Sequence, residues 1–156
     1  MSYELRAVIA GRETLRDVMG DLPAARSAAL GQGLSLMPMT DGLFDSVTDG
    51  DGDRPLGFWS LPSGFDGRLA DWSAVGPVAY LEAEYFGGVG EQRAAVWADG
   101  ALVLGPLGVA EGERFPEDGS PISRALRRLG ATAHGDEDEF SAVGLHRHRH
   151  SSGWVS

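Results

Sequence analysis

Apolar and polar residues alternate most regularly between positions 78 and 104. The runs VAYLEAEYF and EQRAAVWA are separated by the loop GGVG, and a third run, ALVL, follows the dipeptide Asp99-Gly100. Short runs rich in apolar and β-favouring residues, with glycine turns between them, are typical of an antiparallel meander. We therefore predict three consecutive antiparallel strands in this region.

The turns also predict the register of the meander. If residues 87–90 form the first loop, the first two strands pair as Phe86 with Glu91, Glu84 with Arg93, Glu82 with Ala95 and Tyr80 with Trp97. The Asp99-Gly100 turn needs positive φ at both residues. It pairs the second and third strands as Trp97 with Leu102 and Val96 with Val103.

The two faces of this predicted meander differ in polarity. One face carries the apolar side chains expected in the core, which are Leu81, Ala83, Ala94, Val96 and Val103. The other carries Glu82, Glu84 and Arg93, which we expect near water or at a shallow site. Glu84 with Arg93 is interpreted as a cross-strand ion pair, worth about 0.2–1 kcal/mol. Catalysis by these carboxylates is the alternative, although the sequence offers no catalytic partner for them.

Shorter periodic segments predict the remaining elements. Strands are expected at 3–10 and 28–40, the second kinked and near an edge, and helices at 12–19, 42–47, 69–75 and 121–129. The last helix is marked by Ser120 as its N-cap and Pro121 at its first position. The predicted fold is a single α+β domain over residues 1–156, a mostly antiparallel sheet with a central meander and a few short helices on one side. Residues 143–156 are a candidate tail.

Composition narrows the chemistry and the partners. The chain has no cysteine, which excludes disulfides, thiol nucleophiles and thiolate metal sites. All 13 basic residues are arginine and asparagine is absent, which predicts a high-GC, actinobacterial genome because lysine and asparagine use AT-rich codons. A net charge of -10 opposes nucleic-acid and anionic membrane partners and favours a basic protein.

The start of the chain shows no targeting pattern, and no stretch approaches the roughly 20 apolar residues of a membrane span. We expect a cytoplasmic protein without a cofactor.

An acidic loop resembles the start of a calcium site. Asp49, Asp51 and Asp53 alternate, but the sixth and twelfth places hold Arg54 and Ser60 instead of glycine and glutamate. A solvated acidic turn is therefore preferred to a calcium loop.

A histidine segment is the weak candidate for another metal. In an extended chain His146, His148 and His150 would point to one side and could chelate zinc or nickel. The intervening arginines repel a cation. We prefer a charged tail that packs against the acidic body or reaches a partner, and that folding does not require.

The stretch AYLEAEYFGGVGEQRAAVWADG resembles small bacterial immunity-type proteins of toxin systems, which carry an E-Y-F-G-G-x-G-x-Q hairpin. The segments SRALRRLG and DEFSAVGLHRHR are similar to later parts of the same pattern. The residues that match the motif are Glu84, Tyr85, Phe86, Gly87, Gly88, Gly90 and Gln92. The resemblance implies neutralisation of a toxin and brings no catalytic residue, and Gln92 could brace the hairpin against Tyr85.

The predicted function is a non-enzymatic acidic binding protein, an immunity protein that neutralises a cognate basic toxin domain. The expected binding residues are Glu82, Glu84, Tyr85, Phe86, Gln92 and Arg93. An acidic surface would speed encounter with a basic partner by electrostatic steering. The alternative is a small-molecule enzyme or metal-binding protein that uses Glu82, Glu84 and the histidine segment.

Overall fold

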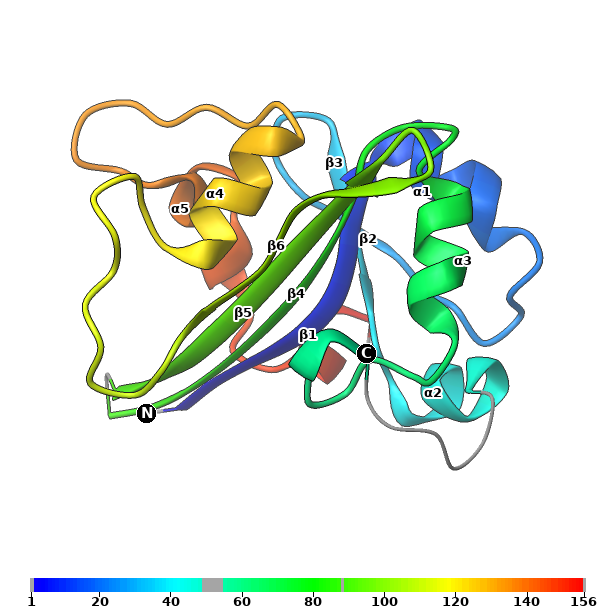
Figure 1. The fold of residues 1–156 in the computed structure, drawn as a ribbon, viewed down its shortest axis with the longest axis horizontal. Helices are drawn as coiled ribbons and strands as arrows, with labels where there is room; N and C mark the ends of the chain where they lie inside the picture. Colours follow the sequence, from blue (N-terminus) through cyan, green and yellow to red (C-terminus); the bar gives the residue numbers. More distant parts are fainter. Residues whose placement is uncertain (1, 49–54, 88, 156) are drawn as a thin grey trace.

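The computed structural model describes residues 2–48, 55–87 and 89–155. Within them a six-stranded antiparallel sheet has the order β2-β3-β1-β4-β5-β6 (Figure 1). The strands are β1 (Ser2–Gly11), β2 (Ala28–Ala29), β3 (Leu34–Pro38), β4 (Val78–Phe86), β5 (Val89–Ala98) and β6 (Ala101–Val109). The predicted α+β class and antiparallel sheet are confirmed.

Helices pack on both faces of the sheet. The α-helices are α1 (Arg12–Met19), α2 (Asp41–Val47), α3 (Phe65–Trp72), α4 (Pro121–Arg128) and α5 (Glu139–Ala142). Three short 3-10 helices are η1 (Pro55–Gly57), η2 (Leu145–Arg147) and η3 (Ser151–Trp154). None of the described helices is both long and apolar enough to span a membrane.

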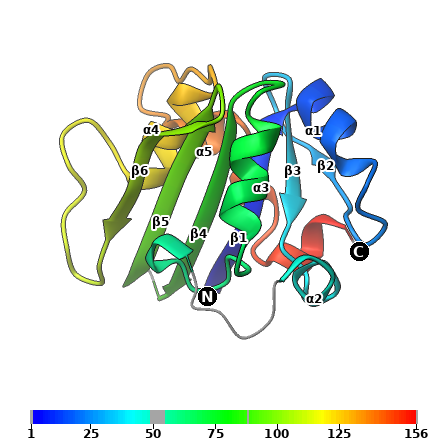
Figure 2. The same cartoon turned by 45° about the vertical axis from the view of Figure 1, so that its right-hand side comes forward.

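The two sides of the sheet each bury an apolar layer. On one side, called here the α4 face, Leu81 and Val96 pack with Ile122 and Leu126 of α4. On the other, the α3 face, α1, α2 and α3 cover a second cluster that contains Tyr80 and Ala95. Figure 2 shows α3 in front of β1 and β4, with α4 and α5 behind the sheet. Helices on one side only were therefore the wrong expectation, because both faces of the central strands are apolar.

Local sequence signals predicted two helices accurately, α1 and α4. The bounds of α1 agree with the prediction, and Leu15 is its buried residue. The N-cap of α4 also follows the prediction, since the Ser120 hydroxyl accepts a hydrogen bond from the Ser123 N–H at 3.2 Å. In contrast, residues 28–40 form two paired strands instead of one kinked strand, because the chain reverses at Gln32 and Gly33, which both have positive φ.

The meander register differs from the prediction by two residues in its first hairpin. Phe86 lies opposite Val89, so Glu84 faces Glu91 and Glu82 faces Arg93. Gly90 was predicted in the loop but lies within β5. A Cβ atom added there would lie 1.9 Å from the Glu84 carbonyl oxygen, so only glycine allows this close approach of the strands.

The second hairpin follows the prediction near its turn. Asp99 and Gly100 both have positive φ, and Trp97 pairs with Leu102. An irregularity next to this pair then places Val96 opposite Leu104 instead of Val103.

The C-terminal segment packs into the domain. Leu145 and Trp154 are buried in the cluster on the α4 face. The Arg149 carbonyl accepts the Glu4 N–H at 2.7 Å, and the Ser151 hydroxyl accepts the Arg6 N–H at 2.9 Å. These bonds cover the part of β1 that β3 does not reach, since the pairing of those strands spans residues 7–11 of β1.

Candidate functional site

The end of the β4–β5 hairpin carries the predicted binding residues, but the sheet divides them between its two faces. Tyr85 and Gln92 lie on the α4 face, because each is two positions along its strand from a residue of that core cluster, Ala83 or Ala94. The others lie on the α3 face, and they are Glu82, Glu84, Phe86 and Arg93. These six residues therefore do not form one continuous site, because successive strand residues point to opposite sides.

On the α4 face, Gln92 joins the hairpin to helix α4. Its side-chain oxygen accepts the Ile122 N–H at 2.9 Å, and its amide nitrogen donates to the Tyr85 hydroxyl at 3.0 Å. Backbone N–H groups in the first turn of a helix lack partners within the helix, so Gln92 satisfies one of them. The tyrosine and glutamine of the motif thus hold the hairpin and α4 together, as expected for the brace.

On the α3 face, Glu82 anchors the loop at residues 55–61 to the sheet, and we call this segment the anchored loop. Its side chain is 0% exposed, whereas the sequence predicted it near water. One carboxylate oxygen accepts the Trp59 N–H at 2.6 Å, and the other accepts the Ser60 N–H and the Tyr80 hydroxyl, each at 2.7 Å. Burial raises the pKa of Glu82 above its ordinary value, and these hydrogen bonds together with Arg6 oppose the shift.

The Tyr80 hydroxyl donates one of these hydrogen bonds to Glu82. Burial, reinforced by the neighbouring Glu82 charge, raises the pKa of Tyr80 well above its ordinary value. The phenol is therefore protonated at neutral pH and donates to the carboxylate. Both oxygens of Glu82 are occupied by structural hydrogen bonds, which is the arrangement of an anchor and not of a free general base.

Arg93, on β5, contacts the same anchored loop and does not pair with Glu84 as predicted. It lies opposite Glu82 in the sheet, and its guanidinium donates to the Gly57 carbonyl. The same group lies 4.9 Å from the centroid of the Trp59 ring, a cation–π contact. Arg93 and Glu82, which are neighbours on adjacent strands, thus both hold this loop against the sheet.

Beyond this loop, the hairpin end forms an open depression on the α3 face that we call the hairpin hollow. It has a volume of about 410 Å³ and is lined by Trp59, Glu84, Phe86, Val89, Gly90, Glu91 and Glu111. Phe86 is 77% exposed and Val89 is 49% exposed. The hollow therefore combines exposed apolar side chains with three glutamates.

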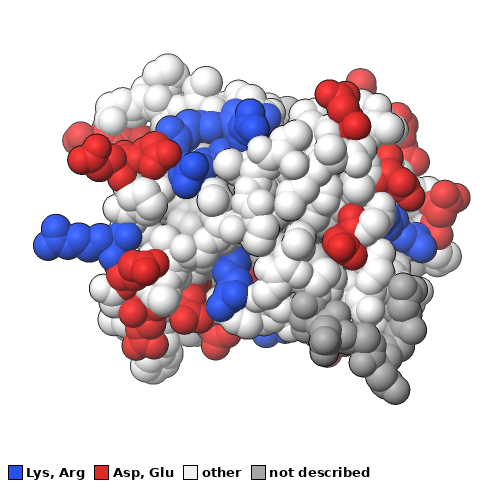
Figure 3. All heavy atoms as spheres, viewed as in Figure 1, with Lys and Arg blue, Asp and Glu red and all other residues white. Residues whose placement is uncertain are grey.

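Like charges face one another across this end of the sheet. Glu84 lies opposite Glu91 on β5 and opposite Glu4 on β1. The Glu4 carboxylate is occupied by an ion pair with Arg6 at 3.2 Å and by hydrogen bonds from Ser151. Directly opposed carboxylates destabilise a sheet unless a cation or a positively charged partner lies between them. Figure 3 shows acidic side chains at the left-hand end of the molecule, with arginine among them, and others at the right-hand end.

Within the described residues, the fold does not bring the candidate metal ligands together. The described residues contain no group of three or more histidine, aspartate or glutamate side chains placed to hold a metal ion. His146 lies on η2, and the His148 ring packs against Trp154 with centroids 4.6 Å apart, so the three imidazoles do not share one extended segment. The acidic turn at residues 49–53 lies outside the described residues.

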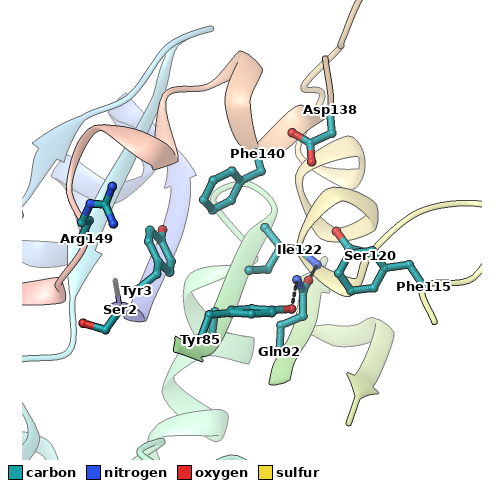
Figure 4. A pocket seen from close by; sticks show the side chains of 11 residues that line it. Ser2, Tyr3, Tyr85, Gln92, Phe115, Ser120, Ile122, Asp138, Phe140 and Arg149 are labelled. Carbon is teal, nitrogen blue, oxygen red and sulfur yellow. Dashed lines mark hydrogen bonds between the residues drawn. The ribbon is translucent and has the colours of Figure 1, made fainter. Parts of the chain in front are cut away.

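Sequence reasoning missed a second cavity, on the α4 face, which we call the aromatic pocket. It has a volume of about 470 Å³ and is lined by Ser2, Tyr3, Ala83, Tyr85, Gln92, Phe115, Ser120, Ile122, Asp138, Phe140 and Arg149 (Figure 4). Its aromatic side chains come from segments far apart in the chain, so no local spacing predicted them. The only signal was the pair Tyr85 and Gln92 within the hairpin motif.

Comparison of this chain with protein-family models, with curated proteins and with solved structures gives no match. The resemblance of the hairpin motif to immunity-type proteins therefore stays a prediction, and function has to be argued from the geometry of the hairpin end.

Proposed function

We propose that this protein is a non-enzymatic binding protein of the cytoplasm that neutralises a basic protein domain, as immunity proteins neutralise toxins. The observation that supports this proposal is the hairpin hollow. Two exposed apolar side chains, Phe86 and Val89, lie there among the carboxylates of Glu84, Glu91 and Glu111. An apolar centre with a charged rim is the usual anatomy of a protein interface.

The charge of the hollow favours a basic partner. Lysine or arginine side chains of a partner would relieve the repulsion between Glu84 and Glu91, which face each other across the hairpin. The net charge of -10 would add long-range attraction and raise the association rate. Phe86 would then supply the apolar anchor, because aromatic residues are enriched among interface residues that dominate binding energy.

The anchored loop supports binding rather than catalysis. Glu82 and Arg93 fix Trp59 beside the hollow, so one wall of the proposed interface is held in place before binding. Such preorganisation lowers the entropic cost of association. The enzyme alternative draws no support from Glu82, whose oxygens already accept three hydrogen bonds.

The test is binding and rescue with the basic polypeptide encoded beside this chain. Co-expression should protect cells from that polypeptide, and its association should slow as salt concentration rises. Phe86→Ala should raise the dissociation rate, and Glu84→Gln with Glu91→Gln should lower the association rate about tenfold or less. Glu13→Gln on α1, an exposed glutamate away from the hollow, is the matched control.

Two results would overturn the proposal. One is the absence of binding between the two proteins at low salt. The other is a complex whose rates change equally in the Glu84→Gln and Glu13→Gln variants, because the hollow would then have no special part in it.

A further inference from the structure

The aromatic pocket lies on the opposite face of the sheet from the hairpin hollow and is independent of it. Its volume of about 470 Å³ falls within the roughly 300–1,000 Å³ of small-molecule sites. Tyr3 and Tyr85 come from β1 and β4, Phe140 comes from α5, and Phe115 comes from the loop before α4. Figure 4 shows Tyr85 below the cavity and Phe140 above it, with Tyr3 at one end.

The walls of this pocket are held rigidly. The Tyr3 hydroxyl donates to the Leu145 carbonyl at 3.0 Å, and the Tyr3 ring meets Phe140 edge-on with centroids 5.4 Å apart. Tyr85 is fixed by the hydrogen bond from Gln92, which is itself fixed by α4. Because the Tyr85 oxygen accepts from Gln92, its own proton is left to donate to a ligand. The cavity is therefore preformed, with aromatic walls and an oriented hydroxyl.

Charges at the two ends give the pocket a direction. Arg149 lies at the end next to Tyr3, and its backbone carbonyl is fixed by the Glu4 N–H. Asp138 lies at the other side, where its carboxylate accepts the Ser141 N–H at 2.9 Å. The ion pairs recorded among the described residues do not include Arg149. A guanidinium is suited to bind a carboxylate through two parallel hydrogen bonds, whereas Asp138 repels an anion at its end.

We propose that the aromatic pocket is a binding site for a small aromatic carboxylate. The ring of the ligand lies between Tyr85 and Phe140, and its carboxylate pairs with Arg149. The exposed Phe115 lines the pocket beside Ser120, at the end away from Arg149. This site adds a small-molecule ligand to a protein whose proposed partner binds on the other face of the sheet.

The experiment uses cinnamate as the probe and its neutral amide, cinnamamide, as the matched ligand. Calorimetry with the full chain should show one cinnamate bound per protein with submillimolar affinity. Arg149→Gln should weaken cinnamate about tenfold, through loss of one charge-assisted pair, and leave cinnamamide unchanged. Phe115→Ala should weaken both ligands. Arg68→Gln, which removes an exposed arginine from α3 on the other face, should weaken neither.

Both test variants change exposed side chains, and Phe115 is 52% exposed, so folding should survive each substitution. Amide NMR shifts induced by cinnamate should centre on Tyr85, Gln92 and Ile122. The proposal is overturned if neither ligand binds the unmodified protein at about 1 mM, the weak end of the affinity scale. It is equally overturned if Arg68→Gln and Arg149→Gln have the same effect, or if the shifts centre on the hairpin hollow.

Discussion

Glu82 and Glu84 lie two residues apart on the same face of β4, but their surroundings are opposite. Glu82 is fully buried and accepts three hydrogen bonds, two of them from the backbone of the covering loop. Glu84 is exposed and faces other glutamates on both neighbouring strands. The first glutamate stabilises the fold, and the second is left for a partner.

The difference comes from a segment distant in sequence. Residues 55–61 cover the α3 face at Glu82 but not at Glu84. The burial of side chains on this face therefore changes between two residues that are only two positions apart. Alternation along a strand predicts which face a side chain occupies. It does not predict what lies above that side chain. An acidic residue in a strand is therefore interpretable only after the loops have been placed.

The largest expected effect on stability is at the buried Glu82. Glu82→Ala should lower the free energy of unfolding by about 3–5 kcal/mol, because it leaves the Trp59 and Ser60 N–H groups buried without acceptors. Urea denaturation measures the loss. Glu84→Ala, the control two residues away, should change stability by less than about 0.5 kcal/mol. Equal losses in the two variants would break the comparison.

A smaller effect is expected at Glu4, the glutamate on the other side of Glu84. Ser151→Ala removes the acceptor for the Arg6 N–H and the hydroxyl that donates to Glu4, so stability should fall by about 1–2 kcal/mol. Ser152→Ala alters the exposed neighbouring serine and should be neutral. If Ser151→Ala is also neutral, the C-terminal segment does not hold β1 as described.

The pH dependence of stability should reflect the burial of Glu82. A raised pKa in the folded state means that protonated Glu82 contributes its full stability below its ordinary value of 4.5. This contribution is lost as the pH rises through the folded-state pKa, because the folded state then holds a charge in a buried place. The stability advantage of the unmodified protein over Glu82→Gln should therefore shrink from acid to neutral pH in urea titrations. An advantage that grows with pH would contradict the assigned direction.

The smallest effect on stability is expected at the exposed Glu84. Glu84→Gln should raise stability by about 0.2–0.5 kcal/mol at low salt, because it removes repulsion from Glu91 and Glu4. The gain should disappear at high salt, where exposed charges are screened. Urea is the suitable denaturant, since it adds no ions. A loss of stability at low salt would mean that Glu84 has a structural role of its own.

Local signals in the sequence predicted part of this fold. The glycine after Asp99 set the second hairpin turn, and Ser120 with Pro121 set the start of α4, because capping and turn residues act within a few positions. Gly90 is the reason that the predicted register of the first hairpin was wrong. Its role is to let two backbones approach, which in sequence is indistinguishable from a turn glycine. The aromatic pocket could not be predicted, since its side chains meet only through the tertiary fold.

The hydrogen bonds between β1 and the segment at residues 149–151 also bear on how the protein is made. Glu4 and Ser151 are 147 positions apart, so all the residues between them have to be synthesised before the two can meet. Residues 2–6 of β1 are synthesised before both of their neighbours in the sheet, β4 and the segment at residues 149–151. During synthesis this early strand is an exposed edge that other chains could pair with. Complete coverage of β1 therefore has to wait until residues 149–151 have been synthesised.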